Sequence, residues 1–220
     1  MDDLVIRITP DNRIYRETIG TTKTKVEISL EQLAETFLES MVPPQKREVE
    51  LPSGTVRYIA REWNGVIKDE TVAMEYETVN RPFKYYKTVF ESIPFPKLIF
   101  LFTVKDKRIK QAKVGALTGL RLKENSIIYH YPYSNVHSSG QICFGNNTLP
   151  KIESLTELYK IPEIFLSSEM NNDLYSGANN SGMVLRELLE LLDGTSFDCS
   201  ILEPMCTYRE FLSVSEENSY

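Results

Sequence analysis

The residues best suited to chemistry lie in one polar segment, YPYSNVHSSGQICFGNN, at residues 131–147. Cys143 follows a turn-rich approach and precedes a glycine and two amides. A structural cysteine behaves as a small buried hydrophobe and usually lies in an apolar run, so this setting favours a displayed thiol. A cysteine nucleophile needs access, thiolate character and donors for a developing oxyanion. The segment is therefore a candidate site for nucleophilic chemistry.

Several polar side chains near Cys143 could assist it. His137 is the only nearby side chain that titrates around neutral pH, because His130 lies farther away in a strand-like run and no histidine follows the cysteine. Asn135 and Asn146 could donate hydrogen bonds to an oxyanion. The candidate catalytic residues are Cys143, Asn135, His137 and Asn146.

Other cysteine chemistries lack their sequence patterns. The Cys…His order of papain-like hydrolases is absent, so a small cysteine hydrolase would have to use His137 as its base. The chain has no C-x-x-C pair and no Cys/His spacing for zinc, so no metal or cofactor site is predicted. Cys199 and Cys206 are interpreted as structural. Three cysteines without a pairing pattern are typical of a reducing, cytoplasmic compartment.

Composition excludes several classes of protein. With 41% hydrophobic and 25% charged residues, the chain of 220 residues has the balance of a soluble globular protein. A net charge of −6 argues against a general nucleic-acid-binding surface. The strongest apolar run, residues 95–104, is too short to span a membrane and predicts a buried strand. The acidic N-terminus lacks the pattern of a signal peptide.

The elements that must position this segment are strands followed by helices. Residues 4–8 and RIYRETI predict two strands around a turn at Asp11 and Asn12. Residues 29–41 predict an amphipathic helix that begins with an S-x-x-Q capping box at Ser29 and Gln32 and packs on the core. We expect residues 1–50 to form this N-terminal part and residues 51–220 to form the main domain.

Residues 51–130 predict an antiparallel meander that includes an Asn64-Gly65 hairpin. The basic run KDKRIKQAK is interpreted as a solvated hairpin tip, and docking of an acidic partner is the alternative. After the cysteine segment, SLTELYKIPEIFLSS predicts a helix kinked at Pro162 or two short helices. MVLRELLELLDG predicts a helix that ends at Gly194 in the left-handed region. The predicted fold class is α+β.

The frame YSNVHSSGQIC resembles the active-site motif of ubiquitin-conjugating (E2) enzymes, which reads H-P-N-[IV], a short glycine-containing turn, then [IV]-C. Asn135 stands eight residues before Cys143, as the motif's asparagine does. Tyr133 and Ser134 replace the motif's histidine and proline. The remaining matches are Val136, Gly140 and Ile142.

The closer resemblance is to prokaryotic E2 family D, which includes protein B of the PRTRC gene systems. That family has a "PSG" turn before the meander, here residues 52–54, and a loop of the type P-x-x-N-V…G-x-[VI]-C-x-G. Family D lacks the E2 histidine and has one after the cysteine. This chain has none there, which leaves His137 as the local substitute.

The resemblance implies an E2-like (UBC) fold and an acyl-transfer function. An E1-like adenylating enzyme would activate a ubiquitin-like β-grasp protein, and Cys143 would accept it as a thioester and pass it to an amine of a protein substrate. No cofactor is implied, because the upstream enzyme uses the ATP. Two alternatives stay open: an inactive E2-like binding or scaffold module, and a plasmid-maintenance factor of a mobile-element system.

Overall fold

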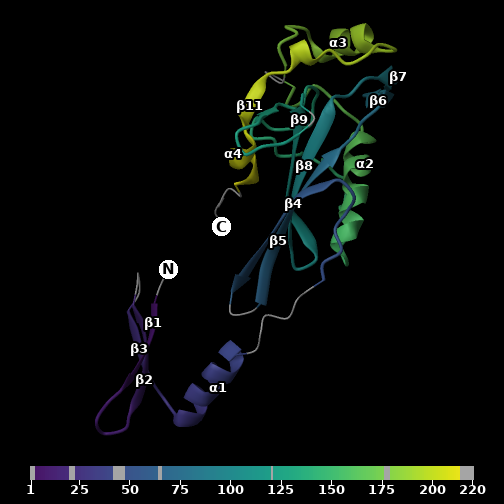
Figure 1. The fold of residues 1–220 in the computed structure, drawn as a ribbon. Coiled ribbons are helices and arrows are strands. Elements are labelled where there is room, and N and C mark those ends of the chain that lie inside the picture. The colour runs from purple at the N-terminus through teal and green to yellow at the C-terminus, as the bar shows by residue number, and fades with distance from the viewer. Residues whose placement is uncertain are drawn as a thin grey trace. The chain divides into compact units, whose positions relative to one another are not determined.

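The computed structural model describes residues 3–19, 23–41, 48–63, 66–119, 121–175 and 179–213 (Figure 1). The chain divides into two compact units, residues 1–48 and residues 49–220. Each unit is described by itself. No helix in the described part of the chain is both long and apolar enough to cross a membrane.

The N-terminal unit is a three-stranded antiparallel sheet followed by a helix. Its elements are β1 (Asp3–Ile8), β2 (Ile14–Ile19), β3 (Thr24–Ile28) and α1 (Leu30–Met41). The capping box is present, because the Ser29 amide donates to Gln32 Oε1 at 3.0 Å and the Gln32 amide donates to Ser29 Oγ at 3.1 Å. The first two strands and the helix confirm the prediction, whereas β3 was not predicted.

The apolar side chains of this unit are only partly covered. Strand register places Ile8, Ile14 and Ile28 in one row of the sheet. Among the described side chains of the unit, Ile14 and Leu33 are the buried apolar ones, while Ile8 and Leu30 are exposed. That the N-terminal unit packs on the meander stays a prediction.

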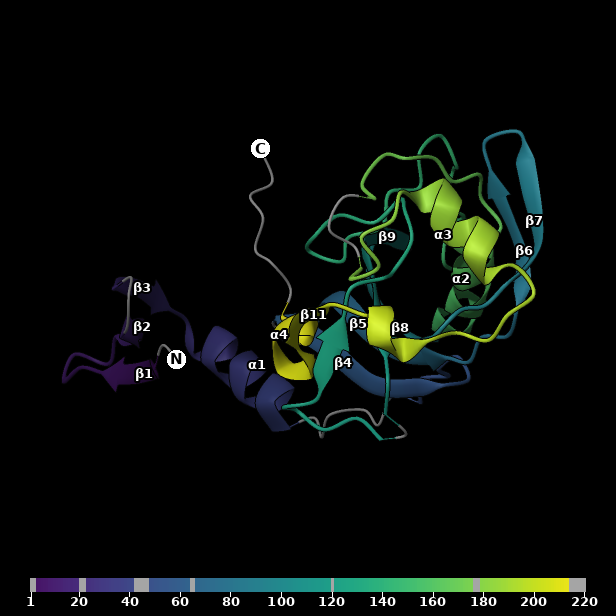
Figure 2. The ribbon, with the colours of Figure 1, turned by 90° about the horizontal axis from the view of Figure 1, so that it is seen from above.

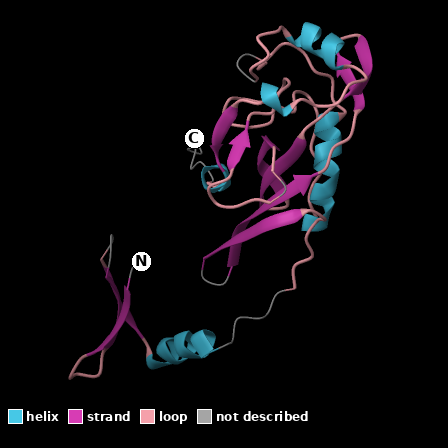
Figure 3. Cartoon of the chain, turned by 45° about the horizontal axis from the view of Figure 1, so that its top comes forward, coloured by secondary structure: helices cyan, strands magenta, loops and turns pink. Residues whose placement is uncertain are grey.

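The second unit is built on a six-stranded antiparallel sheet with the order β11-β10-β9-β8-β5-β4. A separate hairpin, β6–β7, is inserted between β5 and β8, and Figure 3 shows that strands predominate over helices in this unit. The strands are β4 (Thr55–Trp63), β5 (Val66–Tyr76), β6 (Arg81–Tyr85), β7 (Thr88–Ile93), β8 (Lys97–Lys105), β9 (Arg108–Leu117), β10 (Ile127–Tyr129) and β11 (Pro204–Thr207). The result is a mixed α/β fold of mostly antiparallel strands with few helices.

The turns of the meander agree with the sequence. Trp63 pairs with Val66, so β4 and β5 form a tight hairpin, although Asn64 and Gly65 lie outside the described residues. The basic run forms the β8–β9 hairpin, with Asp106 and Lys107 at its tip in the left-handed region. The prediction of a solvated hairpin tip is confirmed for the first part of the run, whereas its last residues continue into the buried part of β9, where Ala112 and Lys113 are buried.

The helices are short. In the described part of this unit they are two 3₁₀-helices (Leu155–Tyr159 and Cys199–Ile201), α2 (Lys160–Leu166), α3 (Leu185–Leu192) and α4 (Tyr208–Leu212). The segment containing Pro162 thus forms two short pieces, with the proline in the first turn of α2, where its missing N–H leaves no bond unmade. Gly194 has φ +77°, which confirms the predicted end of α3.

The two faces of the sheet are covered by different helices. One face buries Phe100, Phe102 and Val114 in a large cluster that includes residues of α2 and α3. The other face packs Ile99 and Leu101 against α4. Figures 1 and 2 show α2 alongside the sheet and α3 beside the β6–β7 hairpin.

Candidate functional site

Tyr133 anchors the start of the Cys143 loop in the aromatic core. Its side chain is fully buried, and its hydroxyl donates to the carbonyl oxygen of Pro94. The ring makes edge contacts with Phe83 and Phe95 at centroid distances of 5.3 Å and 5.1 Å. Burial raises the pKa of Tyr133 well above its ordinary value. The side chain at the histidine position of the E2 motif is therefore a neutral packing residue.

A small hairpin carries Cys143 back toward Asn135. The Cys143 amide donates to the Asn135 carbonyl at 2.8 Å, and Val136 forms a bridge with Ile142. The turn closes where the Gly140 amide donates to the His137 carbonyl at 2.8 Å. The main chain on both sides of the cysteine is thus hydrogen-bonded.

The same hairpin docks on the edge of β9. The Ile142 amide donates to the Ala112 carbonyl and the Val114 amide donates to the Gly140 carbonyl, both at 2.9 Å. Gly140 has φ +83°, and a Cβ there would lie 3.1 Å from the Val114 carbonyl oxygen. Glycine is required at this position for both the backbone conformation and the close approach to the strand.

Asn135 holds the opposite side of the loop. Its φ of 64° lies in the left-handed region, which asparagine tolerates better than most residues. Its side-chain amide donates to the Glu169 carbonyl at 3.0 Å, and its main-chain amide donates to the Asp173 carbonyl at 3.4 Å. Asn135 therefore links the cysteine to the segment that follows α2.

Cys143 is partly exposed and is a free thiol. Phe144, next in the chain, turns toward the core and lies against Phe165 of α2 at a centroid distance of 6.3 Å. Among the described residues, no side chain forms a hydrogen bond with the Cys143 thiol. Cys143 is therefore a partly exposed residue next to one that packs on the aromatic core.

The other predicted site residues lie on exposed parts of the loop. His137 is exposed at the turn, with its main-chain amide bonded to the Gln141 carbonyl at 2.9 Å. Asn146 is exposed after the cysteine. His130 lies beyond β10, where burial lowers its pKa. The structure thus brings Asn135 and Cys143 together through the main chain and leaves His137 and Asn146 at the surface.

The remaining cysteines have separate environments. Cys199 is exposed in a 3₁₀ turn, whereas Cys206 is partly buried in β11. Burial raises the pKa of the Cys206 thiol, and the nearby Glu210 carboxylate raises it further. A thiol with a raised pKa is a poorer nucleophile at neutral pH, which agrees with a structural role for Cys206.

Sequence reasoning missed the groups that hold the loop from outside. Glu169 and Asp173 act through main-chain carbonyls, so their side-chain identity gives no signal. In the sequence, Tyr133 stands out only as a departure from the E2 motif, although its position in an aromatic run at residues 131–133 could have indicated a buried anchor.

The comparisons with known proteins place the loop within a family. A model of prokaryotic E2 family D matches residues 67–205, which is more than half of the chain and includes Asn135, His137, Cys143 and Asn146. The matched range begins after the turn at residues 52–54 and after the N-terminal unit. No curated protein and no solved structure matches the chain. The chain belongs to prokaryotic E2 family D.

Proposed function

We propose that the chain is an E2-like carrier of a ubiquitin-like protein. The observation that carries this proposal is a partly exposed thiol, Cys143, whose loop is fixed by main-chain hydrogen bonds inside the region that matches family D. A bulky incoming thioester needs a nucleophile that is accessible and held still, because positioning supplies much of the rate of such a step.

The reaction has two acyl transfers. Cys143 Sγ attacks the thioester that joins the C-terminal carboxyl of a ubiquitin-like β-grasp protein to an E1-like enzyme, and the E1-like thiolate leaves. An amine of the protein substrate then attacks the new thioester, forms an amide and releases the Cys143 thiol. The donors and acceptors are proteins, and ATP is consumed only upstream.

Asn135 braces the loop in this scheme, since its side-chain amide already donates to the Glu169 carbonyl. In this proposal His137 and Asn146, both exposed, contact the incoming partner. The order of elements supports an E2-like (UBC) arrangement, because an antiparallel meander leads into the cysteine loop and helices follow. The helix α1 lies outside the matched range, and its place in an E2-like fold is part of the proposal.

The test is to mix the purified chain with its E1-like enzyme, ubiquitin-like protein and ATP and to run non-reducing gels. We expect an adduct that disappears with thiol reductant and is absent from Cys143→Ala. Cys143→Ser should give a reductant-resistant oxyester or no adduct. Cys199→Ala is the matched control, because Cys199 is a more exposed thiol that should not be loaded. An adduct that persists in Cys143→Ala would refute the proposal.

An inactive E2-like binding module is the second candidate. It is favoured by Tyr133 and Ser134, both fully buried where the E2 motif has histidine and proline. On this alternative, the chain would bind the E1-like enzyme or the ubiquitin-like protein without forming an adduct. Binding by calorimetry with equal affinity for the parent chain and Cys143→Ala, and no reducible adduct from either, would establish the module and exclude the carrier.

A further inference from the structure

The Cys143 loop is held on two sides by hydrogen bonds to different parts of the fold. On the β9 side, the Ile142 amide donates to the Ala112 carbonyl of β9, which lies within the six-stranded sheet between β10 and β8. On the other side, the Cys143 amide bonds to Asn135, and Asn135 bonds to the carbonyls of Glu169 and Asp173. The second side is therefore only as rigid as the segment at residues 169–173.

That segment is attached to two elements. Met170 is bonded to the β6–β7 hairpin, since its amide donates to the Lys84 carbonyl at 2.8 Å and its carbonyl accepts from the Tyr86 amide at 3.0 Å. The segment also follows directly from the C-terminal end of α2, which Ser167 caps. The position of α2 therefore contributes to the position of the Glu169 carbonyl.

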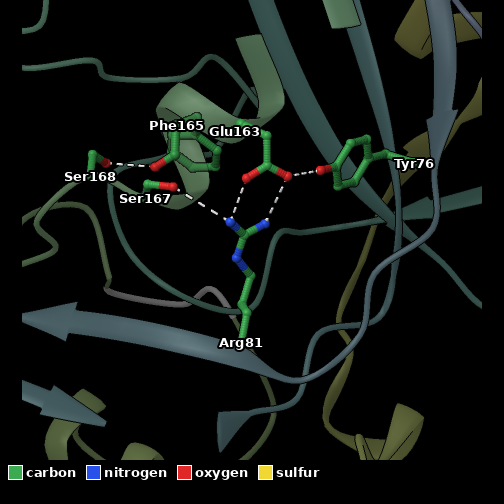
Figure 4. Close-up of polar contacts among 6 residues, drawn as sticks. All are labelled: Tyr76, Arg81, Glu163, Phe165, Ser167 and Ser168. Carbon is green, nitrogen blue, oxygen red and sulfur yellow. Dashed lines mark hydrogen bonds and ion pairs between the residues drawn. The ribbon is translucent and has the colours of Figure 1, made fainter. Parts of the chain in front are cut away.

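Arg81, the first residue of β6, fixes the end of α2 (Figure 4). Its guanidinium makes a two-pronged contact with Glu163, with Nη2 to Oε2 at 2.7 Å and Nη1 to Oε1 at 3.3 Å. Nη2 also lies 3.5 Å from Oγ of Ser167. Paired N–H bonds to one carboxylate fix orientation as well as distance.

The surroundings strengthen this contact. The Arg81 side chain is 19% exposed and the Glu163 side chain 52%, so water screens the carboxylate of this pair more than the guanidinium. The Tyr76 hydroxyl donates to the same Glu163 carboxylate from β5. Hydrogen bonding to Arg81 holds the pKa of Glu163 below its ordinary value, so the carboxylate is charged at neutral pH.

We infer that Arg81 is a positioning residue for Cys143, acting through α2, the Glu169 carbonyl and Asn135. The inference rests on the proposed function in that Cys143 is the group positioned for transfer. The hydrogen bonds of the Arg81 guanidinium go to Glu163 and Ser167, not to the thiol. Arg81 sets how firmly the side of the loop away from β9 is held.

Amide hydrogen exchange followed by NMR on the full chain tests this without any partner protein. In Arg81→Ala, we expect the Cys143 amide to exchange about tenfold faster, while the Ile142 amide, bonded to β9, changes less than about twofold. In Arg81→Lys, the Cys143 amide should exchange faster than in the parent chain but more slowly than in Arg81→Ala, since one ammonium replaces a two-pronged contact. Arg186→Ala is the control, because Arg186 forms its ion pair with Glu190 within α3 at 2.9 Å.

Equal acceleration at Cys143 and Ile142, no acceleration at either, or the same pattern in Arg186→Ala would overturn the inference. If the proposed transfer occurs, Arg81→Ala should lower the maximal transfer rate several-fold with little change in the partner concentration for half-maximal rate. A change confined to that concentration would instead make Arg81 a binding residue. A chain that forms no thioester would end the proposed function but leave the exchange result intact.

Discussion

The two arms of the cysteine loop have opposite environments. The entry arm, residues 131–134, is buried, and its tyrosines pack in the aromatic core. The exit arm, residues 143–147, begins at the partly exposed Cys143 and Phe144 and continues into the exposed residues 145–147. The buried arm thus holds the loop in place, and the exit arm contains the candidate nucleophile, Cys143. Substitutions in the first arm should cost more stability than substitutions at the exposed residues of the second arm.

The largest expected effect is that of Tyr133→Ala. Removing a fully buried aromatic ring that contacts Phe83, Phe95 and Tyr131 should lower the free energy of unfolding by about 3–5 kcal/mol. Urea denaturation of the full chain measures it. Tyr159→Ala, at an exposed tyrosine, is the control and should cost less than about 0.5 kcal/mol. Similar losses in the two variants would contradict the proposed contrast between buried and exposed positions.

Gly140→Ala should have the next largest effect, about 1–3 kcal/mol. The alanine would take a φ of +83°, and its Cβ would lie 3.1 Å from the Val114 carbonyl oxygen. Gly145→Ala in the exit arm separates the two causes, because Gly145 also has positive φ but a Cβ added there would have no neighbouring atom within 4 Å. In thermal unfolding, the midpoint temperature of Gly140→Ala should be lower than that of Gly145→Ala. The reverse order would show that the β9 contact is unimportant.

Tyr133→Phe should cost about 1 kcal/mol at neutral pH, because the buried Pro94 carbonyl loses its donor. The substitution should also change how the free energy of unfolding depends on pH in alkaline solution. Burial keeps Tyr133 neutral when folded, whereas the unfolded chain loses that proton from about pH 10, so stability falls as pH rises above this value. Denaturant titrations from about pH 9 to 11 should show a slope shallower by up to about 1.4 kcal/mol per pH unit in the variant. An unchanged slope would mean that Tyr133 ionises without unfolding.

The smallest effect is expected at the basic tip of the β8–β9 hairpin. The exit arm leads toward this tip, where the Ile152 amide donates to the Lys107 carbonyl at 2.8 Å. Reversing the charges of Lys105 and Arg108, both exposed, should leave stability and transfer rate unchanged if the tip only solubilises. Slower association that is most pronounced at low salt would instead identify a docking surface for an acidic partner.

Periodicity and turn chemistry predicted much of the fold. The buried strand at residues 95–104 and the helix ending at Gly194 follow from local patterns, because burial of apolar residues and the need for positive φ leave signals in adjacent residues. Strands β3 and β11 were not predicted, and β6 and β7 were predicted only as part of the meander, not as a separate hairpin. Their apolar positions are few or irregular, and their pairing depends on segments distant in the chain.

For the candidate site, the sequence by itself determined the residues that could react. The spacing of Asn135 and Cys143, the glycine at residue 140 and the polar setting of the thiol are local properties of one segment. Only the tertiary structure decided how that segment is held. Arg81 and Glu163 lie 82 residues apart, and Glu169 contributes a carbonyl that its side chain does not reveal. Such contacts depend on how β6, α2 and the loop pack together, because main-chain acceptors and long-range ion pairs carry no pattern in the sequence of either partner.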